Sequence, residues 1–159
     1  MLFSTATGYA LRALAALPED GNYSLAKDLQ LLHVATVDAD GRPRVRPVVG
    51  KADEKLELRF STHLDSTKVR HLRHNPEVHI TLAANDIRSR RWLQIEGRAS
   101  ISTSETERRA FWFDGMQAYI SGIDDPRYCV VIVQPSRIEL CSLDKPQAEV
   151  WLAGKANSA

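Results

Sequence analysis

The sequence predicts a mainly β protein whose strands close into a six-stranded antiparallel barrel. Six short segments rich in β-branched and aromatic residues lie between residues 32 and 140, and most connections between them are too short for a crossover helix. Two helical segments stand among these strands, which fits a barrel better than a parallel βαβ sheet. At 159 residues and 43% hydrophobic content, the chain suits one domain with one core.

The N-terminal segment is expected to be helical. Apolar residues recur at helical spacing from Thr5 to Leu17, and Ser24 can cap a second helix from Leu25 to about Leu31. The stretches FSTATGYALRALAAL and YSLAKDL resemble a truncated opening of the winged-helix repressors that sense redox through an iron-sulfur cluster. The recognition helix, the wing and the cluster cysteines of those repressors have no counterpart here. We therefore favour a helical extension that packs on the domain or on a partner subunit over DNA binding.

Each strand is predicted from β-forming residues between turn residues. Asp38 to Gly41 is a turn that makes a hairpin of the first two strands, and Asn75-Pro76 separates a helix from the fourth. Pro135 predicts a break or bulge in the sixth. The expected strands are Leu32 to Val37, Pro43 to Gly50, Leu56 to Thr62, Val78 to Ala84, Trp92 to Ser102 and Tyr128 to Leu140.

Two helices are expected between the strands. No helix or strand is assigned to the C-terminal tail. One runs from about Asp65 to His74. The other begins at Thr103 or Ser104, where Ser104 and Glu107 have the spacing of a capping box, and reaches about Tyr119. From Asp144 onward the sequence has little pattern beyond Val150-Trp151-Leu152.

Composition gives few functional clues. The formal net charge of +1 provides no general attraction to nucleic acid or to an acidic membrane. No apolar run approaches the roughly 18 residues of a membrane span, and Met1 to Phe3 does not open a signal peptide. We therefore expect a cytoplasmic protein without membrane association. Cys129 and Cys141 lack CxxC spacing, which favours buried free thiols.

The start of the helix at Asp65 is a candidate anion site. Ser66, Thr67 and Lys68 place two hydroxyls and an ammonium beside the free N–H groups of a helix N-terminus. Arg46 can supply a second cation from a neighbouring strand. The competing interpretation is that Asp65 or Ser66 only caps the helix while Lys68 lies in solvent.

Three stretches together resemble the FMN-binding split-barrel family related to pyridoxamine 5'-phosphate oxidase: HVATVDADGRPRVRPV, FSTHLDSTKVRHLRHNPEVHI and WLQIEGRASI. A fourth, FWFDGMQAYISGIDDPRYCVVIVQPSRIEL, is similar to the general-stress-protein branch of that family. The resemblance implies a homodimer of six-stranded Greek-key barrels that hold FMN between the subunits. It divides the chain into an N-terminal helical extension (1–30), an FMN-binding split barrel (31–143) and a C-terminal tail (144–159).

The resemblance also implies a set of cofactor-binding residues. The flavin ring and ribityl chain are expected along Arg46, Pro47, Val48, Ser61 and Thr62. The phosphate is expected at Ser66, Thr67 and Lys68, with Arg46 also in reach. Trp92 is expected to approach the flavin from the partner subunit, although simple core packing explains this residue equally well.

The expected function is that of an FMN-dependent oxidoreductase in which the flavin transfers hydride or electrons to an unknown substrate. No catalytic side chain is assigned. Because the tail LDKPQAEVWLAGKANSA lacks the basic, aromatic segment that true pyridoxamine phosphate oxidases use to grip their substrate, vitamin B6 oxidation is not expected. The alternatives are a non-catalytic redox sensor or carrier that binds flavin, haem or a deazaflavin, and a DNA-binding regulator.

Two further groups of basic side chains are interpreted as solvated surface rather than as binding sites. His63, His71, His74 and His79 could hold a metal, but no carboxylate or cysteine follows at a matching distance, so a solvated basic helix face is expected instead. The loop RSRR, from Arg88 to Arg91, is interpreted as solvated rather than as a nucleic-acid patch.

Overall fold

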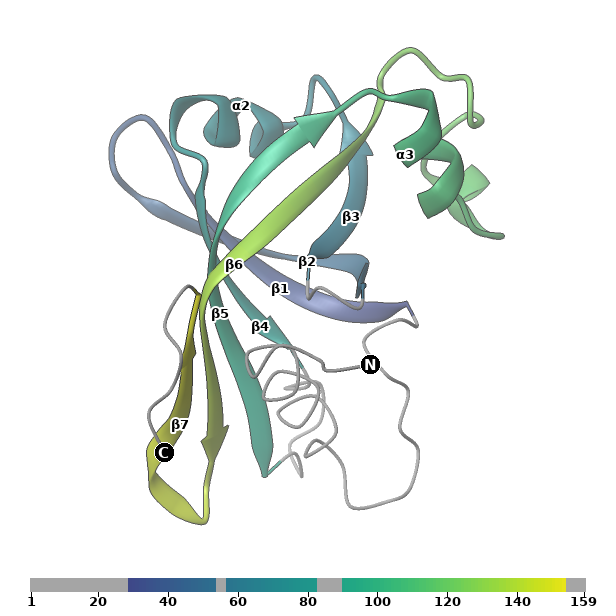
Figure 1. The fold of residues 1–159 in the computed structure, drawn as a ribbon. Helices are drawn as coiled ribbons and strands as arrows, with labels where there is room; N and C mark the ends of the chain where they lie inside the picture. Colours follow the sequence, from purple (N-terminus) through teal and green to yellow (C-terminus); the bar gives the residue numbers. More distant parts are fainter. Residues whose placement is uncertain (1–28, 54–56, 83–89, 154–159) are drawn as a thin grey trace.

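The computed structural model describes residues 29–53, 57–82 and 90–153, and these form seven strands and short helices (Figure 1). The first expected N-terminal helix lies outside the described residues, and so does most of the second, but its expected end at about Leu31 is wrong, because a strand already begins at Gln30. In chain order the elements are β1 Gln30–Val37, β2 Pro43–Ala52, β3 Leu58–His63, α2 Thr67–His74, β4 Glu77–Leu82, β5 Arg91–Ser102, α3 Glu105–Phe111, the 3-10 turn η1 Met116–Ala118, β6 Tyr128–Ser142 and β7 Lys145–Leu152.

The first six strands close into an antiparallel barrel, which confirms the predicted fold. The strand order is β3-β2-β1-β4-β5-β6, and a further pairing of β3 with β6 closes the circle. The inward alternation of apolar residues builds this barrel, because successive side chains of a strand point to opposite faces. The core contains Leu32, Val34, Leu58, Phe60, Ile80, Leu82, Leu93, Ile95, Val131 and Val133.

A seventh strand extends the sheet beyond the barrel and corrects the prediction of six strands followed by a tail of little pattern. β7 pairs antiparallel with the second half of β6, and the register runs from Arg137 opposite Leu152 to Ser142 opposite Lys145. Arg90 of the RSRR loop forms an ion pair with Asp144 in the turn between these strands. β6 is 15 residues long, so its first half can close the barrel while its second half carries β7 (Figure 1).

The second helix is much shorter than expected. α3 ends at Phe111, and the chain then turns through Gly115, whose φ of 97° lies in the left-handed region that favours glycine. Ser104 occupies the N-cap position, but its side chain makes no capping hydrogen bond, so the predicted capping box is wrong. The helix stops because Phe111 and Met116 pack, with Tyr128, into a separate small core against β6.

The predicted irregularity near Pro135 is a bulge in a continuous strand. The register between β5 and β6 shifts between Glu96 and Gly97, opposite Pro135. Both cysteines are unpaired, Cys129 buried and Cys141 half-buried. None of the helices in the described ranges combines the length and the apolar character needed to span a bilayer.

Candidate functional site

Helix α2 begins at Thr67, two residues after the predicted start, and follows strand β3 after a short turn. Ser66 is the N-cap in an extended conformation, and its hydroxyl accepts a hydrogen bond from the backbone N–H of Val69 at 3.4 Å. Asn75 is the C-cap: its N–H donates the last helical hydrogen bond to the carbonyl of His71, its backbone is extended, and the following Pro76 has no N–H to continue the helix. The short strand β3 and α2 together fix the positions of Thr62, Ser66 and Lys68.

These three side chains form a hydrogen-bonded group at the start of α2. Lys68 Nζ donates to Thr62 Oγ1 at 2.9 Å, and the Thr62 hydroxyl donates to Ser66 Oγ at 3.2 Å. Thr62 is buried, with 8% of its surface exposed, while Lys68 is half-buried. The ammonium of Lys68 therefore does not extend freely into solvent, which was the alternative for this residue.

A second polar group joins Arg46 to α2 through strand β1. Arg46 Nη1 donates to Thr36 Oγ1 at 2.6 Å and to the Val34 carbonyl at 3.4 Å, and Thr36 Oγ1 lies 2.9 Å from His71 Nδ1. His71 is only 7% exposed. The expectation of a solvated basic helix face is therefore wrong for His71, whose ring is buried between α2 and the barrel, although His74 is exposed.

The two candidate cations carry an electrostatic cost. Burial, followed by the neighbouring Arg46, lowers the pKa of Lys68, and burial, followed by Arg44, lowers the pKa of Arg46. Within the described ranges neither cation forms an ion pair, whereas Arg44 pairs with Asp38 at 3.1 Å. A half-buried cation without a counter-ion is unfavourable, so a bound anion would relieve both groups.

A pocket of about 900 Å³ opens between the β1–β2 hairpin and α2. Arg46 and Thr67 both lie on its wall, which brings together two of the predicted phosphate-binding residues. Thr62, Ser66 and Lys68 are not among the residues that line the pocket, although Ser66 and Lys68 flank Thr67 in the sequence. Besides those two residues, the lining consists of Asp38, Ala39, Asp40, Pro43, Arg44, Val45, Arg70, His71 and His74.

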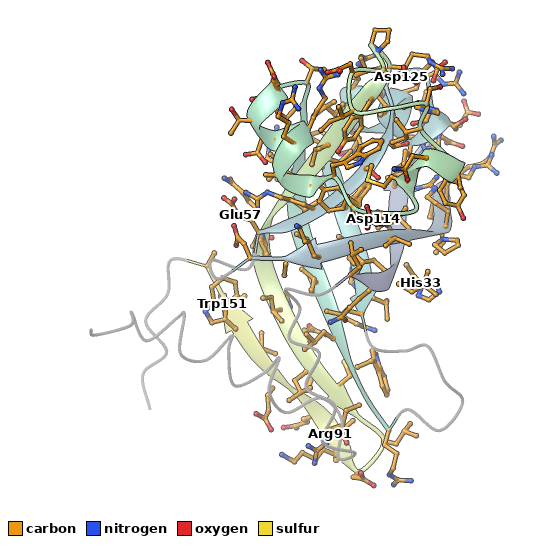
Figure 2. The ribbon with its side chains drawn as sticks, turned by 90° about the vertical axis from the view of Figure 1, so that its right-hand side faces the viewer. His33, Glu57, Arg91, Asp114, Asp125 and Trp151 are labelled. Carbon is orange, nitrogen blue, oxygen red and sulfur yellow. The ribbon has the colours of Figure 1, made fainter. Side chains whose placement is uncertain are left out.

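The remaining predicted residues are more scattered. Pro47 is exposed, and Ser61 is half-buried on β3 opposite Val130. Val48 packs against the barrel core. Arg91, labelled in Figure 2, begins β5 at the end of the strand that Figure 1 shows far from α2, and Trp92 follows it in the sequence. One chain therefore does not bring Trp92 to the other residues, and its role in the site of a partner subunit stays a prediction.

Sequence reasoning missed Thr36 and assigned His71 to the surface. A signal for Thr36 was present, because it continues the buried alternation of Leu32 and Val34 along β1. A polar residue at an inward position requires a hydrogen-bond partner. Among residues 29–53, 57–82 and 90–153 there is no cluster of side chains that could hold a metal ion.

A family model described as pyridoxamine 5'-phosphate oxidase matches residues 23–142. The pyridoxine/pyridoxamine 5'-phosphate oxidase of Xanthomonas euvesicatoria is 32% identical over 97 residues, which cover 60% of this chain and 49% of the relative. That of Burkholderia thailandensis is 36% identical over 97 residues, covering 61% and 40% respectively. The chain thus spans about half the length or less of these curated relatives.

Solved structures share the fold. General Stress Protein 26 from Bacillus anthracis superposes with a TM-score of 0.73 at 19% identity, covering 91% of this chain and 98% of that one. A pyridoxamine 5'-phosphate oxidase-related, FMN binding protein from Nostoc punctiforme superposes with a TM-score of 0.58 at 18% identity, covering 94% of this chain and 90% of that one. An F420 reductase superposes with a TM-score of 0.59 at 26% identity, covering 77% of this chain and 98% of that one. A heme binding protein from Mycobacterium smegmatis superposes with a TM-score of 0.65 at 17% identity, covering 96% of this chain and 60% of that one.

Proposed function

Since the chain belongs to the pyridoxamine 5'-phosphate oxidase family, we propose that it is an FMN-binding oxidoreductase in which α2 and β2 hold the cofactor phosphate. The observation that carries this proposal is the pair of half-buried cations, Arg46 and Lys68, which have no carboxylate partner in the described part of the chain. A phosphate dianion supplies the missing negative charge. When bound, FMN supplies hydride and single-electron transfer.

The residues present fit the phosphate end of FMN chemically. Phosphate oxygens are strong acceptors that favour fixed N–H and O–H donors together with cationic side chains. Arg46 provides a planar set of donors, Lys68 a point charge, and Thr67 an exposed hydroxyl at the first turn of α2. In this proposal these groups bind and orient the cofactor, and they do not identify the substrate.

Titration of the purified protein with FMN and with riboflavin tests the proposal. If Arg46 and Lys68 hold the phosphate, FMN should bind at least about 10-fold more tightly than riboflavin, because hydrogen bonds to charged groups contribute about 1.5 to 3 kcal/mol. Flavin fluorescence or visible absorption measures both affinities. Equal affinities would contradict the phosphate assignment, and no binding of either flavin would contradict the proposed function.

The cofactor is proposed to lie between two copies of the chain. The outer face of the β1–β2 hairpin is unusually apolar, since Leu31, Val45 and Val49 are 40%, 67% and 43% exposed and Leu31 lies opposite Val49. Val45 also lines the pocket, so this apolar face continues into the cofactor site. A second copy that covers the face would bury the apolar side chains and close the pocket in one step.

Val45→Glu is expected to convert a dimer into a monomer and to weaken FMN binding, because a carboxylate would be buried in the interface and near the cofactor phosphate. Light scattering on a size-exclusion column measures the mass. Leu143→Glu is the matched control, since Leu143 is also 64% exposed but lies in the turn between β6 and β7. A monomeric wild-type protein, or a Val45→Glu variant that remains a dimer, would contradict this arrangement.

The fold similarity to an F420 reductase and to a heme binding protein favours one alternative, a protein of the same fold loaded with another cofactor. The absorption spectrum of freshly purified protein separates the two, because flavin and haem have different visible bands. Reduction of an added electron acceptor by NAD(P)H would then distinguish the oxidoreductase from a non-catalytic flavin carrier.

A further inference from the structure

A buried hydrogen-bond chain links helix α2 to the candidate phosphate-binding arginine. Thr36 is 1% exposed and His71 is 7% exposed. The Thr36 hydroxyl lies 2.9 Å from His71 Nδ1 and 2.6 Å from Arg46 Nη1. The three side chains come from α2, β1 and β2, so these hydrogen bonds connect three elements. The two end residues, His71 and Arg46, both line the pocket.

The chemistry of the three groups indicates which of them donates and which accepts each hydrogen bond. A guanidinium can only donate, so the Thr36 oxygen accepts the bond from Arg46. The buried hydroxyl proton of Thr36 then needs an acceptor, and His71 Nδ1 lies at hydrogen-bond distance. With His71 as that acceptor, Nδ1 is unprotonated and the ring proton lies on Nε2, a tautomer assigned from the hydrogen-bond pattern.

The charges around His71 agree with a neutral ring. Burial, followed by Arg46, lowers the pKa of His71 below its ordinary value of 6.5. Arg44 on β2 and Arg70 on α2 also oppose its protonation, while Asp38 in the hairpin turn favours it. Since the unfavourable influences prevail, the neutral ring is favoured, and a neutral imidazole has one nitrogen that can accept a hydrogen bond.

We propose that His71 is a positioning residue for the anionic group of the cofactor, acting through Thr36 to hold the Arg46 guanidinium in its binding orientation. Arg46 Nη1 is engaged by Thr36 and by the Val34 carbonyl. Its Nε and Nη2 atoms have no partner among the described residues and remain available to an anion in the pocket. An arginine that is fixed before binding loses less side-chain entropy when the ligand arrives. The inference rests on the proposed function.

The matched variants are His71→Leu, which removes the acceptor, and Thr36→Val, which removes the hydroxyl with little change of shape. Each should weaken FMN binding about 5- to 10-fold, the effect of losing one hydrogen bond, and leave riboflavin binding unchanged, because riboflavin has no phosphate. Thr36→Ser and His71→Asn, which restore a hydroxyl and a nearby acceptor, should recover most of the FMN affinity. An equal loss for riboflavin would show a merely structural role and overturn the proposal.

A double-mutant cycle tests whether His71 acts through Arg46. In an Arg46→Met background, His71→Leu should cause no further loss of FMN affinity, because the side chain that His71 positions is gone. Independent, multiplying losses would overturn the proposal.

Nitrogen NMR of the protein without cofactor separates this inference from the proposed function. His71 should show the Nε2–H tautomer at neutral pH, and the Arg46 Nε–H signal should be sharp in the wild type and broadened in His71→Leu. A failure to bind any flavin would contradict the proposed function alone. The Nδ1–H tautomer, a doubly protonated ring, or an Arg46 signal unaffected by His71→Leu would overturn the positioning role.

Discussion

Lys68→Met should weaken FMN binding by about 10- to 100-fold, the loss expected when one charge-assisted hydrogen bond to phosphate is removed. Riboflavin affinity should change much less, because riboflavin has no phosphate and methionine keeps an unbranched side chain of similar length while losing the ammonium. The effect should be large because Lys68 is half-buried, where its charge is poorly screened by solvent. Fluorescence titration of both flavins measures the difference.

Lys145→Met is the matched control for the loss of one lysine charge. Lys145 pairs with Glu149 at 2.7 Å on the exposed strand β7, in the part of the sheet that extends beyond the barrel. Its replacement should leave the affinities for both flavins unchanged. A similar loss of FMN affinity in both lysine variants would mean that net charge, rather than the position of Lys68, attracts the cofactor.

Gly97→Ala should destabilise the fold by about 2 to 3 kcal/mol, near the upper end of the range for overpacked interiors. The added Cβ would lie 2.7 Å from the backbone oxygen of Gln134 and 2.8 Å from Val133 Cγ1. The backbone of Gln134 cannot yield without disturbing the bulge between β5 and β6. Urea denaturation should show a lower midpoint with an unchanged slope.

Gly122→Ala provides the comparison for Gly97. A Cβ at Gly122 would meet nothing within 4 Å, so the same chemical change should leave the free energy of unfolding within about 0.5 kcal/mol. If Gly97→Ala were as stable as Gly122→Ala, the close approach of β5 and β6 at the bulge would be wrong.

The barrel was predictable because its strands follow simple alternation. Leu32 and Val34 on β1, and Leu58 and Phe60 on β3, alternate with more exposed residues and lie in the core. β7 was not predictable in this way, because its only apolar run is Val150 to Leu152 and its pairing depends on the unusual length of β6. α3 likewise ended early for a tertiary reason, the packing of Phe111 into the small core.

The candidate site shows the same division between local and tertiary information. The capping role of Ser66 and the presence of Lys68 at the helix start follow from local sequence, and the structure shows Ser66 as the cap. The pairing of His71 with Thr36 links residues 35 positions apart, which no local pattern in α2 reveals. The bond from Lys68 to Thr62 similarly depends on the angle between β3 and α2.

The closure of the barrel by β3 and β6 has a consequence for folding. β2 pairs with β3 only as far as Phe60, and the segment from Ser61 to His63 is paired in the sheet with Tyr128 to Val130 alone. Thr62 is thus held by a strand far along the chain, and such non-local pairing is slow to form. During synthesis, the segment that contains Arg46, Thr62 and Lys68 leaves the ribosome well before β6, so the anion site cannot assemble until β6 has followed. Recovery of flavin binding during refolding would therefore report the moment at which the barrel closes.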